Sequence, residues 1–219
     1  MATTFRDRSH AGQILAGFLR EYQGDSDALV LALPRGGVPV AFEVSQCLRV
    51  PLDIIVVRKL GVPGHEELAM GAIASGGVRV LNDDVIHHLA ISPGIIDTVA
   101  GNESREIERR DLEYRGDRPR PDLRGRVVIL VDDGLATGST MKAAVMAVRK
   151  QGPKSIVVAV PVASASTCEE FQDIADRMVC ANMPEAFSAV SNWYDDFSQT
   201  SDDEVRSLLA LAPRAKSAE

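Results

Sequence analysis

The sequence predicts an α/β fold with an open, mostly parallel core sheet of five strands, flanked by helices. Two observations predict it. Short apolar runs alternate along the chain with segments of helical periodicity, and the runs are apolar throughout instead of alternating with polar residues. Strands that are apolar on both sides belong to a parallel sheet buried between helices. The five core runs are Ala28–Leu33, Asp53–Val57, Val127–Val131, Ile156–Val162 and Met178–Ala181.

Helices are predicted between and around these strands. Ser9 is the expected N-cap of the first helix, Ser92-Pro93 opens a long polar helix, and Ser201 to Glu204 form a capping box. The last seven residues are expected to be frayed. The expected helices cover residues 9–22, 38–48, 92–115, 140–151, 164–175 and 201 onward.

Glycine and proline interrupt the chain after the second core strand. Gly61-Val62-Pro63-Gly64 predicts a mobile loop. The apolar runs Leu68–Ala74 and Val78–Leu81 flank Gly76-Gly77, which predicts a hairpin.

Composition fits one globular domain over residues 1–219, since 45% of the 219 residues are hydrophobic and 25% are charged. The net charge of -7 argues against broad nucleic-acid or anionic-membrane binding. Cys47, Cys168 and Cys180 are widely spaced and are expected to be buried reduced thiols. With no apolar leader and no run long enough to span a bilayer, the protein is expected to be soluble and cytoplasmic.

The segment from Val127 to Thr140 carries the most chemical information. Its strand ends in Asp132 and Asp133, and a turn with Gly134 and Gly138 then opens onto a helix. Ligands of open α/β sheets bind beyond the carboxyl ends of the strands. Adjacent carboxylates can accept hydrogen bonds from neighbouring sugar hydroxyls or hold a hydrated magnesium ion. They also occur as helix caps or as a solvated acidic pair.

The turn itself suits an anion. Its glycines allow close backbone approach, and the N–H groups at a helix N-terminus form an anion-binding nest. The hydroxyls of Thr137, Ser139 and Thr140 add donors. Ordinary turn chemistry also explains such residues, but the strand and carboxylates before them favour a ligand site. A Walker A loop is excluded because Ser139 stands where lysine is required, and no dinucleotide-binding glycine fingerprint is present here.

This segment resembles the signature of type I phosphoribosyltransferases. The resemblance is closest to a small bacterial subgroup of that family and extends over nearly the whole chain. It implies the family fold with a small C-terminal hood. It also implies binding of phosphoribosyl pyrophosphate, with Asp132 and Asp133 on the ribose hydroxyls and the following loop on the 5′-phosphate. The loop residues are Gly134, Leu135, Ala136, Thr137, Gly138, Ser139 and Thr140.

Two further segments match the family's pyrophosphate contacts. Pro34-Arg35-Gly36-Gly37 follows the first core strand, where the glycines let N–H groups approach an anion and Arg35 adds a fork of donors. The resemblance implies a cis peptide between Pro34 and Arg35. Arg58 and Lys59 are expected to end the second core strand, on opposite faces, with Lys59 the preferred pyrophosphate contact. Arg35 and Lys59 are therefore the expected catalytic residues.

The resemblance also implies a lid and a hood. The lid, about residues 60–80, would close over the reaction and exclude water. In the hood, about residues 183–200, Phe187 and Trp193 would bind a flat acceptor. Magnesium is the expected cofactor, with Asp132, Asp133 and Asp196 as its ligands. Hypoxanthine-type relatives carry an acid where Ala136 stands, so the motif assigns no general base.

The function implied is transfer of the ribose 5-phosphate group from phosphoribosyl pyrophosphate to a nitrogen acceptor, such as a nucleobase, in nucleotide metabolism. The alternative is a non-catalytic regulator that senses phosphoribosyl pyrophosphate. A regulator needs an output partner, yet the sequence shows neither a helix-turn-helix segment nor a basic stripe. The expected partners are small molecules, without nucleic acid or membrane. A homodimer is compatible with the family, whose members often dimerise.

Overall fold

The computed structural model describes residues 4–116 and 118–213, apart from the side chains at positions 66 and 67. Its main sheet has five strands in the order β2-β1-β6-β7-β8, and every neighbouring pair is parallel. The predicted fold class is confirmed. The strands are β1 (Ala28–Ala32), β2 (Leu52–Ile54), β6 (Val127–Val131), β7 (Ser155–Val162) and β8 (Arg177–Asn182).

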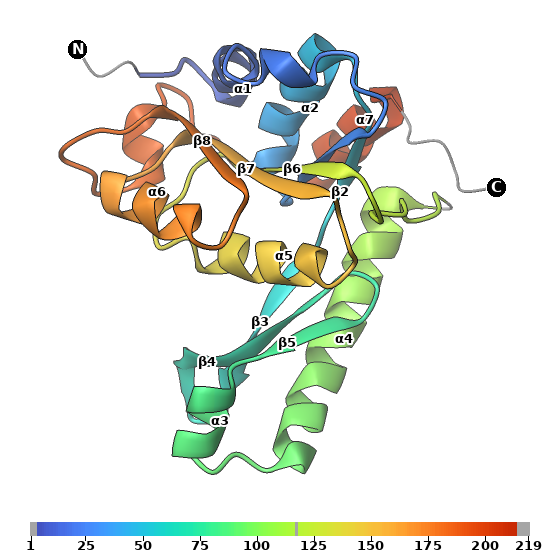
Figure 1. The fold of residues 1–219 in the computed structure, drawn as a ribbon, viewed down its shortest axis with the longest axis vertical. Coiled ribbons are helices and arrows are strands. Elements are labelled where there is room, and N and C mark those ends of the chain that lie inside the picture. Colours follow the sequence, from blue (N-terminus) through green and yellow to red (C-terminus); the bar gives the residue numbers. More distant parts are fainter. Residues whose placement is uncertain (1–3, 117, 214–219) are drawn as a thin grey trace.

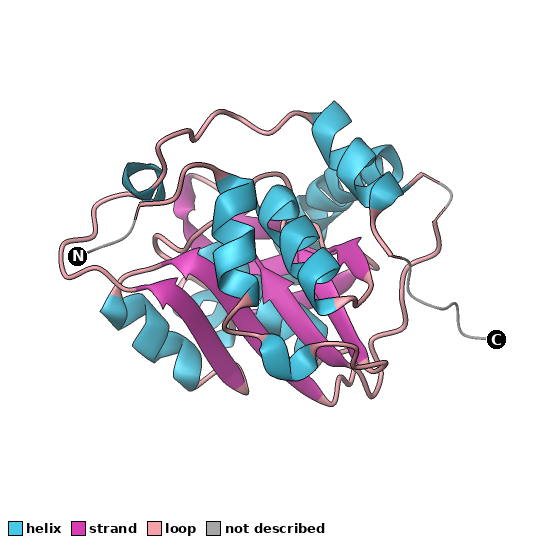
Figure 2. Ribbon diagram, turned by 90° about the horizontal axis from the view of Figure 1, so that it is seen from above, coloured by secondary structure: helices cyan, strands magenta, loops and turns pink. Residues whose placement is uncertain are grey.

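Helices cover both faces of this sheet (Figures 1 and 2). Side chains alternate along β6: Ile129 and Val131 pack into one buried cluster, and Val128 and Leu130 into another. The first cluster lies under α1 and α2, and the second under α5. The helices around the sheet are α1 (Arg8–Ala16), α2 (Gly37–Leu48), α5 (Ser139–Arg149), α6 (Ala165–Gln172) and α7 (Asp202–Leu211), with 3-10 turns η1 (Arg20–Tyr22) and η2 (Val190–Trp193).

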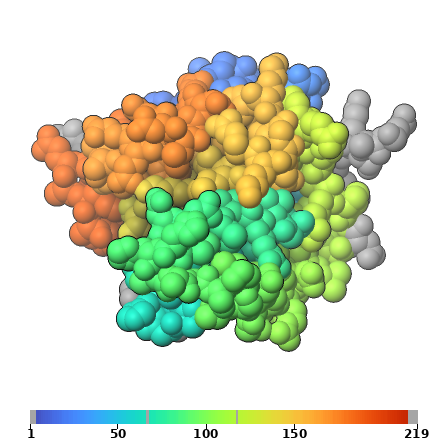
Figure 3. All heavy atoms as spheres, turned by 60° about the horizontal axis from the view of Figure 1, so that its bottom comes forward, coloured from blue at the N-terminus to red at the C-terminus, as the bar shows by residue number. Residues whose placement is uncertain are grey.

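A second, antiparallel sheet with the strand order β3-β4-β5 lies below α5 in Figure 1, and Figure 3 shows this part of the chain in cyan to green. Its strands are β3 (Val57–Val62), β4 (His65–Ala74) and β5 (Val78–Leu81), and it is followed by α3 (Asp83–His88) and α4 (Pro93–Arg115). α4 packs against β3 and β4 on one side, while α5 approaches from the other. The predicted hairpin at Gly76-Gly77 is confirmed, but α3 was not expected.

Two sequence predictions are wrong in this region. Gly61 and Val62, predicted in a loop, belong to β3, and only Pro63-Gly64 makes the turn to β4. Arg58 and Lys59 do not end the second core strand, because β2 stops at Ile54. The chain then changes sheets: Ile55 N donates to Ala32 O of the first sheet, whereas Val56 O accepts from Ser75 N beside the second. The apolar run 53–57 continues through this change, so hydropathy alone did not reveal it.

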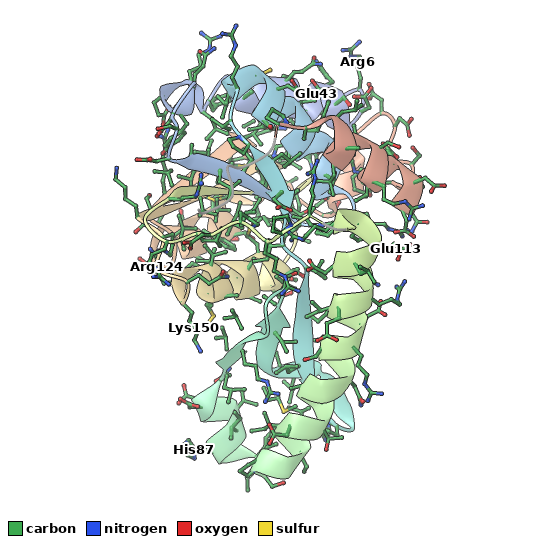
Figure 4. The ribbon with its side chains drawn as sticks, turned by 90° about the vertical axis from the view of Figure 1, so that its right-hand side faces the viewer. Arg6, Glu43, His87, Glu113, Arg124 and Lys150 are labelled. Atoms are coloured by element: carbon green, nitrogen blue, oxygen red, sulfur yellow. The ribbon has the colours of Figure 1, made fainter. Side chains whose placement is uncertain are left out.

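The helix caps follow their predicted chemistry with one exception. Ser92 and Ser201 cap α4 and α7 through their side chains, as predicted. The first helix is capped by Asp7 and not by Ser9, because the Asp7 carboxylate accepts a 2.7 Å hydrogen bond from His10 N. The predicted fraying concerns residues that are mostly outside the described range. Figure 4 shows Glu113 near the end of α4, on the side of the molecule where α7 lies.

Two further observations concern the cysteines and the helices. The cysteines are free, but Cys47 is exposed, whereas Cys168 is buried and Cys180 is half-buried. Within the described residues, no helix combines the length and apolar character needed to cross a bilayer.

Candidate functional site

The two acids and the two glycines predicted from separate motifs lie in contact. β1 and β6 are paired neighbours, with Ala32 opposite Val131, so their carboxyl ends meet at one edge of the sheet. A Cβ atom on Gly36 would lie 2.1 Å from Asp133 Oδ2, and one on Gly37 would lie 2.9 Å from the Asp132 Cα atom. Both positions therefore need glycine for steric reasons, and the backbone of residues 36–37 lies directly on the acid pair.

The peptide bond between Pro34 and Arg35 is cis, as predicted. The Arg35 side chain extends toward α7, where its Nη1 lies 3.6 Å from Asp202 Oδ1. It lines a cavity of about 390 Å³ whose wall also holds Arg206 and Thr200. The loop backbone is thus positioned on the acid pair, while the arginine head group contacts the start of α7.

Hydrogen bonds from neighbouring segments hold the backbone of the predicted phosphate loop, while several of its side chains are exposed to solvent. Leu135 is buried and its N–H donates to Val162 O over 2.9 Å, while Thr167 Oγ1 donates to Ala136 O over 3.1 Å. Gly138 has φ +67°, and a Cβ atom there would lie 2.7 Å from the Phe171 ring. The side chains of Thr137, Ser139 and Thr140 are exposed. The first N–H groups of α5, which have no partner within the helix, follow at Ser139 and Thr140.

The acid pair is held in an unusual electrostatic setting. Burial, with the neighbouring Asp133 charge, raises the pKa of Asp132 well above its ordinary value. Burial also raises the pKa of Asp133, and the charge and hydrogen bond of Arg8 oppose that rise. Arg8 Nε and Nη2 both lie 2.9 Å from Asp133 Oδ2. Sequence reasoning missed Arg8, because no motif or spacing links two residues 125 positions apart.

Arg58 and Lys59 point to opposite faces of β3, as alternation predicts. Arg58 Nε donates to Glu103 Oε2 of α4 over 2.7 Å, away from the predicted site. Lys59 lines a cavity of about 580 Å³ between the second sheet and α5, and Ser139 and Thr140 of α5 also line it. The structure therefore places Lys59 on a cavity that the phosphate loop also lines, and it directs Arg58 elsewhere. Closure of the predicted lid stays a prediction.

The hood is joined to the N-terminal segment. Phe5 N donates to Trp193 O and Asp196 N to Arg6 O, each over 2.8 Å. Phe187 and Trp193 are half-buried and pack on a small cluster centred on Phe5, Ala11, Val162 and Tyr194. The hood also touches the site, because Tyr194 Oη donates to Asp133 O over 2.6 Å and Val190 packs over Gly134.

The three predicted magnesium ligands do not form one cluster. Asp196 is exposed and its carboxylate accepts from Ser198 N over 2.9 Å. Among the side chains that the structure describes, which leave out those at positions 66 and 67, no group of three or more acidic, cysteine or histidine residues could hold a metal ion. Two adjacent carboxylates still suit magnesium, which commonly binds one or two protein carboxylates together with substrate phosphates and water. The donor set thus fits an ion that arrives with a phosphorylated ligand.

Comparison with known proteins agrees with this geometry. The family model of the phosphoribosyl transferase domain matches residues 7–197, most of the chain. The chain belongs to the phosphoribosyl transferase family. Two curated relatives come from Mycobacterium tuberculosis and are named putative phosphoribosyl transferases MT0597 and Rv0571c. Each is 47% identical to this chain over 210 residues, which is 96% of this chain. The chain spans about half the length of these relatives, 47%.

A solved structure extends the comparison to three dimensions. The protein TT1426 from Thermus thermophilus is 40% identical and has a TM-score of 0.86, covering 94% of this chain and 98% of that one. The family match begins at Asp7 and ends at Phe197. The acid pair, both anion loops, Arg8 and most of the hood therefore lie inside the phosphoribosyl transferase domain.

Proposed function

We propose that the protein transfers the ribose 5-phosphate group of phosphoribosyl pyrophosphate to a nitrogen acceptor, with release of pyrophosphate. The observation that carries the proposal is the contact between Gly36-Gly37 and Asp132-Asp133 beside the loop 134–140. A sugar phosphorylated at both ends needs two anion sites with hydroxyl acceptors between them. Main-chain N–H groups serve the anions, and carboxylates serve the hydroxyls.

Each segment has a role in this proposal. The loop 134–140 and the first turn of α5 would hold the 5′-phosphate, and the acid pair would hold the ribose. The backbone of Gly36 and Gly37 would bind pyrophosphate, with Lys59 adding charge from the cavity that it shares with Ser139 and Thr140. Arg35, which contacts Asp202, would have to turn from α7 to join them.

Catalysis in such a site is mainly positional and electrostatic. Pyrophosphate leaves ribose C1 as a nitrogen nucleophile approaches, and the transition state carries positive charge on the ribose. Fixed N–H groups and Lys59 would stabilise the negative charge that grows on the leaving group. Magnesium, held by Asp132 and Asp133 together with the ligand's oxygens, would neutralise part of that charge when bound.

The acceptor is proposed to be a flat nitrogen heterocycle under the hood. Phe187 and Trp193 are packed on the Phe5 cluster and remain half-exposed, so part of the aromatic surface of the hood is available, and the hood touches the acid pair through Tyr194. Aromatic faces suit planar bases. A nucleobase is the simplest molecule of this class.

Pyrophosphate release tests the proposal. The protein is incubated with phosphoribosyl pyrophosphate, magnesium and a panel of purines and pyrimidines. We expect release with at least one acceptor, loss of release in Asp132→Asn, and normal release in the control Asp122→Asn, whose exposed carboxylate lies in the connector before β6. If phosphoribosyl pyrophosphate binds but no acceptor causes pyrophosphate release, the sensing regulator is favoured. If phosphoribosyl pyrophosphate does not bind, both the transferase and the regulator are rejected.

A further inference from the structure

The loop that follows β1 sends its backbone and its arginine to different places. Gly36 and Gly37 lie on the acid pair, whereas the Arg35 side chain extends to α7. Its recorded ion-pair partner is Asp202, the first residue of α7, and Arg35 Nη1 lies 3.6 Å from Asp202 Oδ1. Because the two side chains are 33% and 40% exposed, this pair is weak and shifts an equilibrium by no more than about fivefold.

Asp202 is itself held in place. The hydroxyl of Tyr114, a buried residue of α4, donates to the same Asp202 Oδ1 over 2.6 Å. Ser201 caps α7, since its hydroxyl accepts a hydrogen bond from Glu204 N over 3.1 Å. The side chain and the backbone of Asp202 are therefore both fixed, and its negative charge is held beside Arg35.

The neighbouring charges do not replace Asp202 in this contact. The cavity of about 390 Å³ beside the pair is also lined by Glu113, Asp203 and Arg206. Arg206 forms ion pairs with both Asp203 and Glu113, so these two acids already have a cation. The cavity gives the Arg35 head group room to leave Asp202, and the next two residues of its loop lie at the proposed pyrophosphate position.

We propose that Asp202 is a positioning residue that holds Arg35 away from the pyrophosphate position until the ligand displaces it. The inference rests on the proposed function, which puts pyrophosphate on the Gly36-Gly37 backbone. A pyrophosphate group offers a guanidinium a stronger, bidentate acceptor than one carboxylate oxygen. Breaking the Arg35–Asp202 pair lowers the apparent affinity in proportion to the fraction of molecules in which Arg35 is free.

Removing the charge of Asp202 tests this role. In Asp202→Asn, the side-chain carbonyl oxygen can still accept the hydrogen bond from Tyr114, but the attraction for Arg35 is lost. Asp203→Asn is the matched control, because it removes one negative charge from the neighbouring residue, whose recorded ion pair is with Arg206. The measurement is the dissociation constant, by calorimetry with magnesium, of phosphoribosyl pyrophosphate and of ribose 5-phosphate, which lacks the pyrophosphate group.

We expect Asp202→Asn to bind phosphoribosyl pyrophosphate about threefold more tightly than the wild type, because Arg35 is free to reach the ligand. Asp203→Asn should bind it as the wild type does, and ribose 5-phosphate should bind all three proteins equally. Unchanged or weaker binding of phosphoribosyl pyrophosphate by Asp202→Asn would overturn the role. Equal tightening in Asp203→Asn, or equal tightening for ribose 5-phosphate, would also overturn it, because the effect would then come from long-range charge.

The same substitution in an Arg35→Ala background shows whether the effect passes through the arginine. Arg35→Ala should bind phosphoribosyl pyrophosphate about tenfold more weakly than the wild type, and adding Asp202→Asn should change nothing further. A threefold gain without the Arg35 side chain would contradict the proposal. If the wild type binds both ligands and Asp202→Asn binds neither more tightly, only the role of Asp202 is wrong. A wild type that binds neither ligand would instead reject the proposed function.

Discussion

At the scale of single residues, the site depends on two positions, Gly36 and Gly37, that have no side chain. Gly36 and Gly37 do not have positive φ, so their requirement comes from contact with the acid pair and not from backbone conformation. The same pair of glycines appears in the sequence as a simple turn. Only the paired strands β1 and β6 show that a side chain at Gly36 would displace the Asp133 carboxylate and that one at Gly37 would meet the backbone of Val131 and Asp132.

Gly36→Ala tests this contact. The new methyl group would meet Asp133 Oδ2 at 2.1 Å, so the carboxylate or the loop must move. We expect loss of stability of about 1–3 kcal/mol in denaturant unfolding and at least tenfold weaker binding of phosphoribosyl pyrophosphate.

Gly101→Ala is the matched control for that substitution. Gly101 lies inside α4, and a Cβ atom there has nothing within 4 Å. Because alanine favours helix, this variant should gain up to about 1 kcal/mol and bind normally. Equal binding by both alanine variants would show that the close contact at Gly36 is not part of the site.

At the scale of elements, strand β3 divides its charges between two faces. Lys59→Met should weaken binding of phosphoribosyl pyrophosphate about 10- to 100-fold, because a charge-assisted contact is lost. Arg58→Met should leave binding within about twofold, because Arg58 pairs with Glu103 on the opposite face. Calorimetric titration of the two variants measures both values. Equal losses of binding in the two variants would mean that Lys59 contributes only long-range positive charge and makes no direct contact with the ligand.

The contact between α4 and α7 predicts a pH effect on stability. Tyr114 Oη donates to Asp202 Oδ1 over 2.6 Å. Burial and this bond raise the pKa of Tyr114 to about 12, while the bond from Tyr114 lowers the pKa of Asp202. A lowered carboxyl pKa stabilises the fold above the unfolded pKa, and this contribution is lost as pH falls through the folded value.

Tyr114→Phe should therefore reduce the free energy of unfolding by about 1 kcal/mol at neutral pH, and by less once the pH has fallen through the lowered pKa of Asp202. Urea unfolding over this pH range measures the difference. Tyr22→Phe is the control, because that hydroxyl accepts from Arg177 Nη1 over 3.4 Å and the charge of Arg177 does not change in this range. A Tyr114→Phe effect that is the same at every pH would mean that the Asp202 charge contributes nothing.

The elements also show where prediction from sequence ends. The core strands, the long helix α4 and the capping box at Ser201 were predicted, because each depends on neighbouring residues. The break between β2 and β3 was not, since Ile55 and Val56 continue an apolar run while their hydrogen bonds change from one sheet to the other. Helix α3 is a single short element with no buried residue, and so it leaves no hydrophobic pattern.

At the scale of the whole molecule, the site combines local motifs with one distant contact. The acids, the phosphate loop and the glycine pair were predictable because each is contiguous in the sequence. Their meeting was predictable from the rule that ligands bind at the carboxyl ends of parallel strands. Arg8 was not, because it reaches the acid pair across the fold from a helix that carries no recognisable motif.

The hood also depends on contacts between distant parts of the chain, which the sequence did not reveal. Its aromatic residues were predicted as a platform for the acceptor, and the structure also gives them a packing role against Phe5 and Val162. Main-chain hydrogen bonds from Phe5, Asp195 and Asp196 join residues 5–6, just before the matched family domain, to residues 193–196 near its end. Because these bonds bring the N-terminal segment and the hood together, both Arg8 and Tyr194 can donate hydrogen bonds to Asp133. These contacts connect the hood to the proposed ribose site.

The most direct measurement is a crystal structure of the protein with phosphoribosyl pyrophosphate and magnesium. We predict the 5′-phosphate on residues 134–140, the ribose hydroxyls within hydrogen-bond distance of Asp132, and pyrophosphate on the Gly36-Gly37 backbone. Clear density for the ligand elsewhere on the molecule, or an empty crevice at concentrations that saturate binding in solution, would contradict the account.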